Sequence, residues 1–228
     1  MRYSVIIPAG GSSQRFGTGN KLFQLLQGKP VFLHAVEQFR KFAEDQDIVI
    51  PVHQEFMEET GELLNRFLPG NRIRITSGGK DRTHSVINAL ELISPDCDLI
   101  AVHDAARPLI SEKTIQAVYD AAAVHGAAAA ARKSTNTLKR SCDDGTITSQ
   151  GIDRESVWEI ETPQTFRTEL LRNALQQAAA EGVSFTDDSA AVEHFANCRT
   201  YPVIPNEINL KITHFQDIAL AEALLRLR

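Results

Sequence analysis

Short apolar runs alternate along this sequence with longer segments of helical period, and this alternation restricts the chain to few folds. The runs predict strands at residues 4–7, 47–52, 72–76, 99–103 and 200–203. Apolar residues at three- and four-residue spacing predict helices over residues 31–43, 56–67, 85–93 and 114–124. Strands that alternate with helices of this length form βαβ units. We therefore expect an α/β protein with a Rossmann-like, mostly parallel sheet and helices on both faces.

Two more helices are predicted towards the end of the chain. Thr213 and Gln216 fit a capping box for a helix over about 214–225. Another helix is expected after Thr186, with Asp187 and Asp188 near its positive end.

The polar segment 133–155 interrupts the alternation. Its β-prone pieces, 137–139 and 146–149, flank Asp144-Gly145, a strong hairpin-turn signal. A two-stranded hairpin alone is marginal in water, so we expect this arm to lean on a second copy of the chain. The domain organisation predicted is one domain over residues 1–228 with 133–155 as an inserted β-arm. Residues 127–131, all alanine, favour a helix by propensity, but their place in the alternation predicts a strand.

Composition excludes several classes of protein. The chain has 228 residues, 43% of them hydrophobic, which suits a folded domain with a sizeable core. A net charge of −5 argues against a nucleic-acid binder. Cys97, Cys142 and Cys198 form no CxxC pair, so neither a zinc site nor a disulfide framework is indicated. The sequence shows no signal peptide and no apolar run of membrane-spanning length, so we expect a soluble, cytoplasmic protein without membrane contact.

The loop after the first strand, PAGGSSQRFGTGNK at residues 8–21, carries the first functional signal. Glycines let the backbone approach a ligand and expose N–H groups to an anion. Arg15 and Lys21 add two cations. The loop matches neither the GxxxxGK[ST] nor the GxGxxG pattern. We interpret it as a loop that binds a nucleoside triphosphate. The alternative is an ordinary solvated Gly/Ser loop.

Two further segments leave predicted strands at the same edge of the sheet. They are SGGKDRTHS at 77–85 and VHDAARP at 102–108. Asp104 lies at the carboxyl end of a central strand, where a metal-triphosphate or ribose contact belongs. Each segment alone could be an ordinary turn; together the three predict one binding site.

Taken together, these motifs resemble a known family, 2-C-methyl-D-erythritol 4-phosphate cytidylyltransferase of the non-mevalonate isoprenoid pathway. The resemblance rests on PAGGSSQRF with Lys21, SGGKDRTHSV, VHDAARP, NTLKR, IDRESVW followed by TPQTF, TDDSAA and INLKIT, in this order over nearly the whole chain. It implies a Rossmann-like domain, a β-arm that clasps a twin in a homodimer, and Mg²⁺-dependent transfer of CMP from CTP. The product would be 4-diphosphocytidyl-2-C-methyl-D-erythritol, with release of pyrophosphate.

The resemblance also implies roles for individual residues. Arg15 and Lys21 would be catalytic. The nucleotide-binding positions would be Ala9, Gly10, Gly11, Gly79, Ser85 and Asp104. The methylerythritol phosphate would be positioned by Arg154, Lys211, Thr137 and Thr162, with Thr137 and Arg154 coming from the partner's arm. No protein metal ligand is expected, because Mg²⁺ would be held mainly by the CTP phosphates.

This chain departs from the usual family pattern at four positions. Gly10 stands where an alanine is usual, Ser13 where a glycine is, Asn20 where a proline is, and Lys80 where an acidic residue is. These departures affect the expected loop path and base contacts but leave both catalytic cations in place.

The proposed nucleophile, a phosphate monoester, is already anionic, so the reaction needs no general base. Catalysis would rest on positioning and charge stabilisation. Three alternatives stay open. A ribitol 5-phosphate cytidylyltransferase shares the loop, the arm and the Asp-Ala-x-Arg-Pro core. A sugar-phosphate nucleotidyltransferase could use UTP or GTP. A catalytically silent nucleotide-binding module would bind CTP without releasing pyrophosphate.

Overall fold

A seven-stranded sheet forms the centre of the computed structural model, which describes residues 1–10, 16 and 20–227. The strand order is β11-β7-β10-β6-β1-β4-β5. All neighbouring strands run parallel except β10, which is antiparallel to both β6 and β7. The mostly parallel sheet is therefore confirmed. The strands are β1 (Tyr3–Ile6), β4 (Ile48–Val52), β5 (Arg74–Ser77), β6 (Leu99–Val102), β7 (Ala127–Lys133), β10 (Trp158–Arg167) and β11 (Tyr201–Val203).

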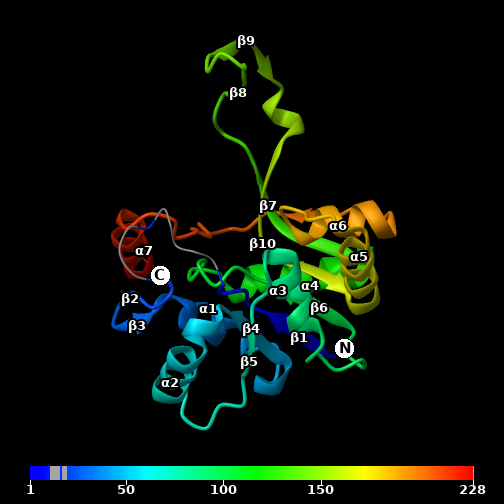
Figure 1. The fold of residues 1–228 in the computed structure, drawn as a ribbon. Coiled ribbons are helices and arrows are strands. Elements are labelled where there is room, and N and C mark those ends of the chain that lie inside the picture. The colour runs from blue at the N-terminus through cyan, green and yellow to red at the C-terminus, as the bar shows by residue number, and fades with distance from the viewer. Residues whose placement is uncertain (11–15, 17–19, 228) are drawn as a thin grey trace.

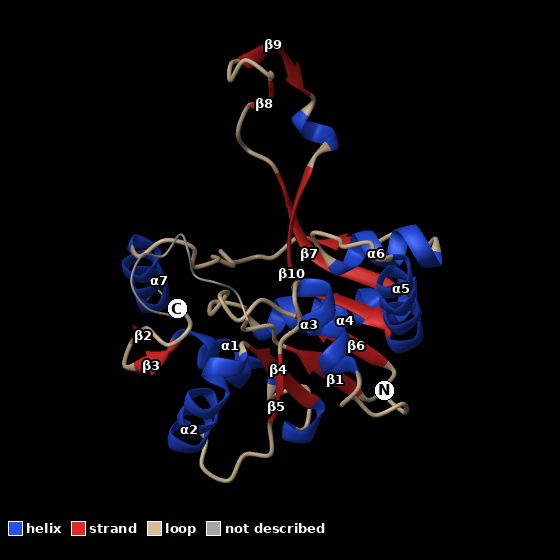
Figure 2. Cartoon of the chain, in the orientation of Figure 1, coloured by secondary structure: helices blue, strands red, loops and turns tan. Residues whose placement is uncertain are grey.

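Helices cover both faces of this sheet, as Figures 1 and 2 show. Successive strand residues point to opposite faces, so Val5 belongs to one apolar core and Ile6 to the other. The first core includes side chains of α1 and α4, and the second includes side chains of α3, α5 and α6. The helices are α1 (Val31–Phe39), α2 (Met57–Phe67), α3 (Arg82–Leu90), α4 (Glu112–His125), α5 (Thr168–Glu181), α6 (Asp188–Ala196) and α7 (Gln216–Arg226).

Short elements join these layers. A small hairpin of β2 (Leu25–Leu26) and β3 (Lys29–Pro30) leads directly into α1. Single 3₁₀ turns occur at η1 (Asp45–Asp47), η2 (Gln54–Phe56) and η3 (Arg154–Ser156). Within the described residues, no helix has the length and apolar character needed to cross a bilayer.

The segment 133–155 contains the predicted hairpin, which projects away from the body of the molecule (Figure 1). Strands β8 (Leu138–Ser141) and β9 (Ile147–Ile152) pair antiparallel. Gly145 adopts the positive φ of +81° that the tight turn needs. At the base of this arm, the ammonium of Lys133 lies 4.3 Å from the centre of the Trp158 ring. The strand over the five alanines is confirmed as part of β7. The domain boundaries and the arm's role in a dimer stay predictions.

The chain between β7 and α7 differs from the sequence expectations in two ways. Strand β10 and helix α5 were not predicted from the sequence. The predicted capping box is wrong, because α7 begins at Gln216 without a side-chain cap. Instead, Asp217 Oδ2 accepts the N–H groups of Thr213 and His214, both at 2.7 Å. The helix expected after Thr186 is confirmed as α6, with Asp187 as its N-cap.

Candidate active site

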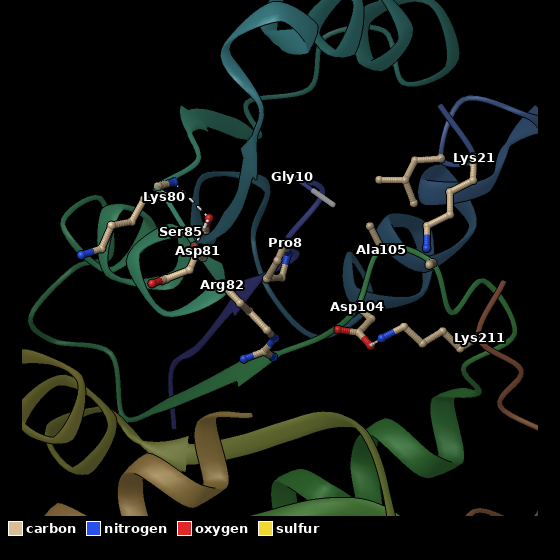
Figure 3. A pocket seen from close by; sticks show the side chains of 13 residues that line it. Pro8, Gly10, Lys21, Lys80, Asp81, Arg82, Ser85, Asp104, Ala105 and Lys211 are labelled. Carbon is tan, nitrogen blue, oxygen red and sulfur yellow. Dashed lines mark hydrogen bonds and ion pairs between the residues drawn. The ribbon is translucent and has the colours of Figure 1, made fainter. Parts of the chain in front are cut away.

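The three predicted loop segments meet in one cavity, here called the pocket, of about 400 Å³. It lies at the ends of β1, β5 and β6, which run parallel within the sheet, so their carboxyl ends share one edge. Figure 3 shows the side chains that converge there from these loops and from the segment before α7. The lining residues are Pro8, Gly10, Lys21, Leu22, Gly79, Lys80, Asp81, Arg82, Ser85, Asp104, Ala105, Ala106 and Lys211.

The glycine turn after β5 is fixed by its own hydrogen bonds. Gly79 N–H donates to Ser85 Oγ at 3.0 Å, and that hydroxyl donates to Asp81 O at 2.8 Å. Asp81 caps α3 by accepting His84 N–H at 2.9 Å. A Cβ on Gly79 would lie 2.3 Å from His84 Cβ, so only glycine fits this turn. Ser85 is thus a buried support of the loop.

Asp104 is the most heavily paired carboxylate of the pocket. Its Oδ2 lies 2.8 Å from Lys211 Nζ and 3.6 Å from Arg107 Nε. Burial alone would raise the pKa of Asp104, but the charges of Lys211, Arg82 and Arg107 outweigh it and bring the pKa to about 2. Asp104 is therefore an anion within a cationic surrounding.

Four cations of the described part of the chain line the pocket, which suits a polyanionic ligand: Lys21, Lys80, Arg82 and Lys211. Arg82 was not identified from the sequence. Its guanidinium lies 2.6 Å from Asp188 Oδ2, and Asp188 is only 1% exposed at the start of α6. Burial raises the pKa of this carboxyl, with Arg82 acting against the rise. The one available signal was an arginine in the first turn of a helix that follows a glycine turn.

The structure places the remaining predicted site residues as follows. Gly10 lines the pocket, and the backbone N–H of buried Ala9 donates to Pro51 O at 2.8 Å. Gly11 and Arg15 lie outside the described residues. Thr162 is 4% exposed and lies behind the pocket, where its Oγ1 accepts Asp104 N–H at 3.0 Å.

The two arm residues, Thr137 and Arg154, are not in the pocket of their own chain. Both are exposed. Arg154 Nη1 donates to Thr135 O at 3.2 Å, and its Nε lies 3.7 Å from Glu155 Oε1. These contacts hold the guanidinium on the arm.

Carboxylates available for a metal ion are few. Among the described residues, no group of three or more His, Cys, Asp and Glu side chains is placed to hold one. Asp81 and Asp104 are the carboxylates among the pocket-lining residues. Mg²⁺ keeps several waters and is bound through one or two carboxylates plus substrate phosphates, so this donor set fits such an ion.

Glycine turns and cations lie together at the carboxyl edge of this α/β sheet. This arrangement is typical of one class of protein, the Rossmann-like nucleotidyltransferases. The comparison with known families gives the particular member. A model of 2-C-methyl-D-erythritol 4-phosphate cytidylyltransferase matches residues 3–227, and the chain belongs to this family.

Individual relatives align with this chain over nearly their full lengths. The 2-C-methyl-D-erythritol 4-phosphate cytidylyltransferase of Solibacter usitatus is 37% identical, over 99% of this chain and 96% of the relative. That of Endomicrobium trichonymphae is 39% identical, over 99% and 100%. The crystal structure of the enzyme from Thermus thermophilus superposes with a TM-score of 0.81 at 30% identity, covering 99% of this chain and all of that one.

The family membership defines the activity. The protein is an enzyme, a cytidylyltransferase that transfers a cytidylyl group from CTP to 2-C-methyl-D-erythritol 4-phosphate in isoprenoid biosynthesis.

Proposed function

We propose that the transfer is a direct in-line displacement in this pocket. A phosphate oxygen of 2-C-methyl-D-erythritol 4-phosphate attacks the α-phosphorus of CTP, and the bond from that phosphorus to the β-phosphate bridging oxygen breaks. The electron pair of that bond leaves with pyrophosphate. The cytidylyl group is then joined to the acceptor phosphate through a new diphosphate linkage. The observation that carries this proposal is the convergence of Lys21, the Gly79 turn, Asp104 and Lys211 on one cavity.

Lys21 and Arg15 supply the charge stabilisation. The attacking and leaving groups are both anionic, so the barrier is dominated by repulsion and by charge on the phosphoryl oxygens. Lys21 supplies a compact charge at the α-phosphate, and Arg15 bridges phosphate oxygens with its planar guanidinium. Lys21 lines the pocket, which supports its part of the assignment.

The glycine turns hold the nucleotide. Gly10, Gly11 and Gly79 let backbone N–H groups approach CTP, with Ala9 and Ser85 fixing the strand exit and the turn. Asp104 would face the metal-triphosphate or the ribose. Asp104, whose Oδ2 lies 2.8 Å from Lys211 Nζ, is an ionised carboxylate at this site. A bound Mg²⁺ would be held mainly by the CTP phosphates. It would neutralise the phosphate charge during transfer.

The acceptor phosphate is held by residues of two chains. Lys211 comes from the same chain as the pocket. Thr162 of that chain would act indirectly, because its Oγ1 accepts the backbone N–H of Asp104 from behind the pocket. Thr137 and Arg154 come from the arm of a second chain in a homodimer. The exposed position of both residues on an arm that points away from its own body supports this arrangement (Figure 1).

A substrate panel tests the proposal. Pyrophosphate release is measured with CTP and Mg²⁺ in the presence of methylerythritol phosphate or ribitol 5-phosphate, and with UTP or GTP in place of CTP. Release that depends on methylerythritol phosphate and CTP is expected. Preference for ribitol 5-phosphate would assign the other cytidylyltransferase, and CTP binding without release would indicate a silent nucleotide-binding module.

A further inference from the structure

His103 is completely buried directly before Asp104, and none of the roles described above uses it. Its ring packs against Phe39, with the ring centres 5.0 Å apart. Both ring nitrogens nevertheless have polar partners. Nε2 lies 3.1 Å from Arg107 O, and Nδ1 lies 3.2 Å from Thr162 Oγ1. Burial lowers the pKa of His103 to about 4, so the ring is neutral near neutral pH.

These partners determine which nitrogen carries the proton. A carbonyl oxygen can only accept, so Nε2 must donate to Arg107 O. Nδ1 of the neutral ring is then an acceptor and receives the hydroxyl proton of Thr162. Thr162 Oγ1 in turn accepts the backbone N–H of Asp104 at 3.0 Å. The donor and the acceptor are therefore fixed in each of the three hydrogen bonds, from Asp104 N–H through the Thr162 hydroxyl and the imidazole to Arg107 O.

This chain of hydrogen bonds fastens the turn that carries Asp104. Arg107 N–H donates to Asp104 O at 3.0 Å, which closes the turn over residues 104–107. The imidazole holds the far end of this turn at Arg107 and, through Thr162, its near end at Asp104. Thr162 belongs to β10, so the turn is also tied to the neighbouring strand.

We propose that His103 is a positioning residue for the cytidylyl transfer, because its fixed tautomer orients the Thr162 hydroxyl that holds Asp104 at the pocket edge. The inference rests on the proposed role of Asp104 in the nucleotide site. An apolar side chain could fill the same space against Phe39, but it could not specify this geometry. Fully satisfied buried polar networks have that effect on a site.

The tautomer is the first test, and it needs no activity. In the full-length protein labelled with ¹⁵N-histidine, correlation spectra near neutral pH distinguish a protonated Nε2 from a protonated Nδ1. We expect His103 to carry its proton on Nε2, with that proton protected from exchange with water. A proton on Nδ1 would overturn the proposal, because Thr162 could then no longer donate to the ring.

Kinetic variants are the second test. His103→Leu and Thr162→Val each remove the hydrogen bond between the Thr162 hydroxyl and His103 Nδ1. Each should lower kcat/KM about tenfold, as expected when a buried hydrogen bond is lost. The double variant should lose no more than either single variant, because both break the same chain. His103→Asn keeps an acceptor towards Thr162, and Thr162→Ser keeps the hydroxyl. Both should recover most of the lost activity.

Two reference variants separate the possible failures. Phe39→Leu loosens the packing against the ring without touching a hydrogen bond, so it should lower the melting temperature and leave kcat/KM near the wild-type value. Asp104→Asn should slow the reaction. If His103 acts through Asp104, His103→Leu should change kcat and KM in the same proportion as Asp104→Asn does. A folded, fully active His103→Leu beside a slow Asp104→Asn would refute only the positioning role. A fully active Asp104→Asn would refute the proposed site role of Asp104 and this inference with it.

Discussion

The ammonium of Lys211 lies 2.8 Å from Asp104 Oδ2, so the lysine assigned to the incoming phosphate is also the main partner of this half-buried carboxylate of the pocket. The two residues come from different parts of the fold, Asp104 from the exit of β6 and Lys211 from the chain before α7. An incoming phosphate and Asp104 would share one cation, which links substrate binding to the charge of Asp104.

Asp104 should therefore make stability depend on pH in the acid range. Its pKa falls from 3.8 to about 2 on folding, so the folded state favours the ionised carboxylate. This contribution is fully present above pH 3.8. It is lost as the pH falls towards about 2, and at about 1.4 kcal/mol per unit it amounts to roughly 2 kcal/mol.

Urea unfolding across this pH range measures the effect. Asp104→Asn should remove this part of the acid-dependent loss of unfolding free energy. Asp96→Asn, which removes one exposed carboxylate before β6 and outside the pocket, is the matched control. An unchanged profile in Asp104→Asn would mean that the carboxylate is not stabilised in the folded state.

Replacing Lys21 should impair turnover far more than nucleotide binding. Lys21→Ala is expected to lower kcat by about 10²- to 10³-fold, comparable to the loss of one oxyanion-hole donor. Arg15→Ala should have the same effect. The dissociation constant of CTP, measured by calorimetry without acceptor, should change little by comparison. Near-normal turnover in either variant would remove that residue from the catalytic pair.

Mixed dimers should reveal whether the site is shared. Arg154→Ala alone is expected to raise KM for methylerythritol phosphate, because the proposed contact of the arm with the acceptor phosphate is lost. When an Arg154→Ala chain pairs with a Lys21→Ala chain, one of the two pockets has both an intact body and an intact arm. Activity should then reappear on mixing two weakly active homodimers, with about one site per dimer. Failure to recover any activity after verified subunit exchange would show that each site is built from one chain.

A steric test separates the two glycine turns of the pocket. Gly79→Ala places a methyl group 2.3 Å from His84 Cβ and 2.7 Å from His84 C, so the turn or α3 must move. Gly10→Ala meets nothing closer than His53 N at 3.8 Å. We expect a clear drop in melting temperature for Gly79→Ala and almost none for Gly10→Ala. Equal melting temperatures would show that the Gly79 turn adapts without cost.

The sequence was sufficient to predict the parts of this fold that follow local patterns. The alternation predicted β1, β4, β5 and β6, and the Asp144-Gly145 signal predicted the hairpin turn. The meeting of the three loops in one pocket followed from parallel strands that end at one edge. Each of these inferences uses residues that are close in sequence or a rule about strand direction.

The features that depend on long-range pairing could not be predicted in this way. β10 has Pro163 and the polar residues Glu161, Thr162 and Gln164 in its middle, which argues against a central strand. The structure accommodates them with a register shift against β7 between Ile160 and Gln164. The pairing of Arg82 with Asp188 likewise depends on α3 and α6 meeting across the fold.

Trp158, at the base of the arm, is the only tryptophan of the sequence. Its ring is in contact with the Lys133 ammonium, and these two residues are the first of β10 and the last of β7. Any change in how the arm is seated alters the surroundings of this one indole. The protein thus contains a built-in fluorophore, and its emission during dilution would report the proposed association of two chains without an added label.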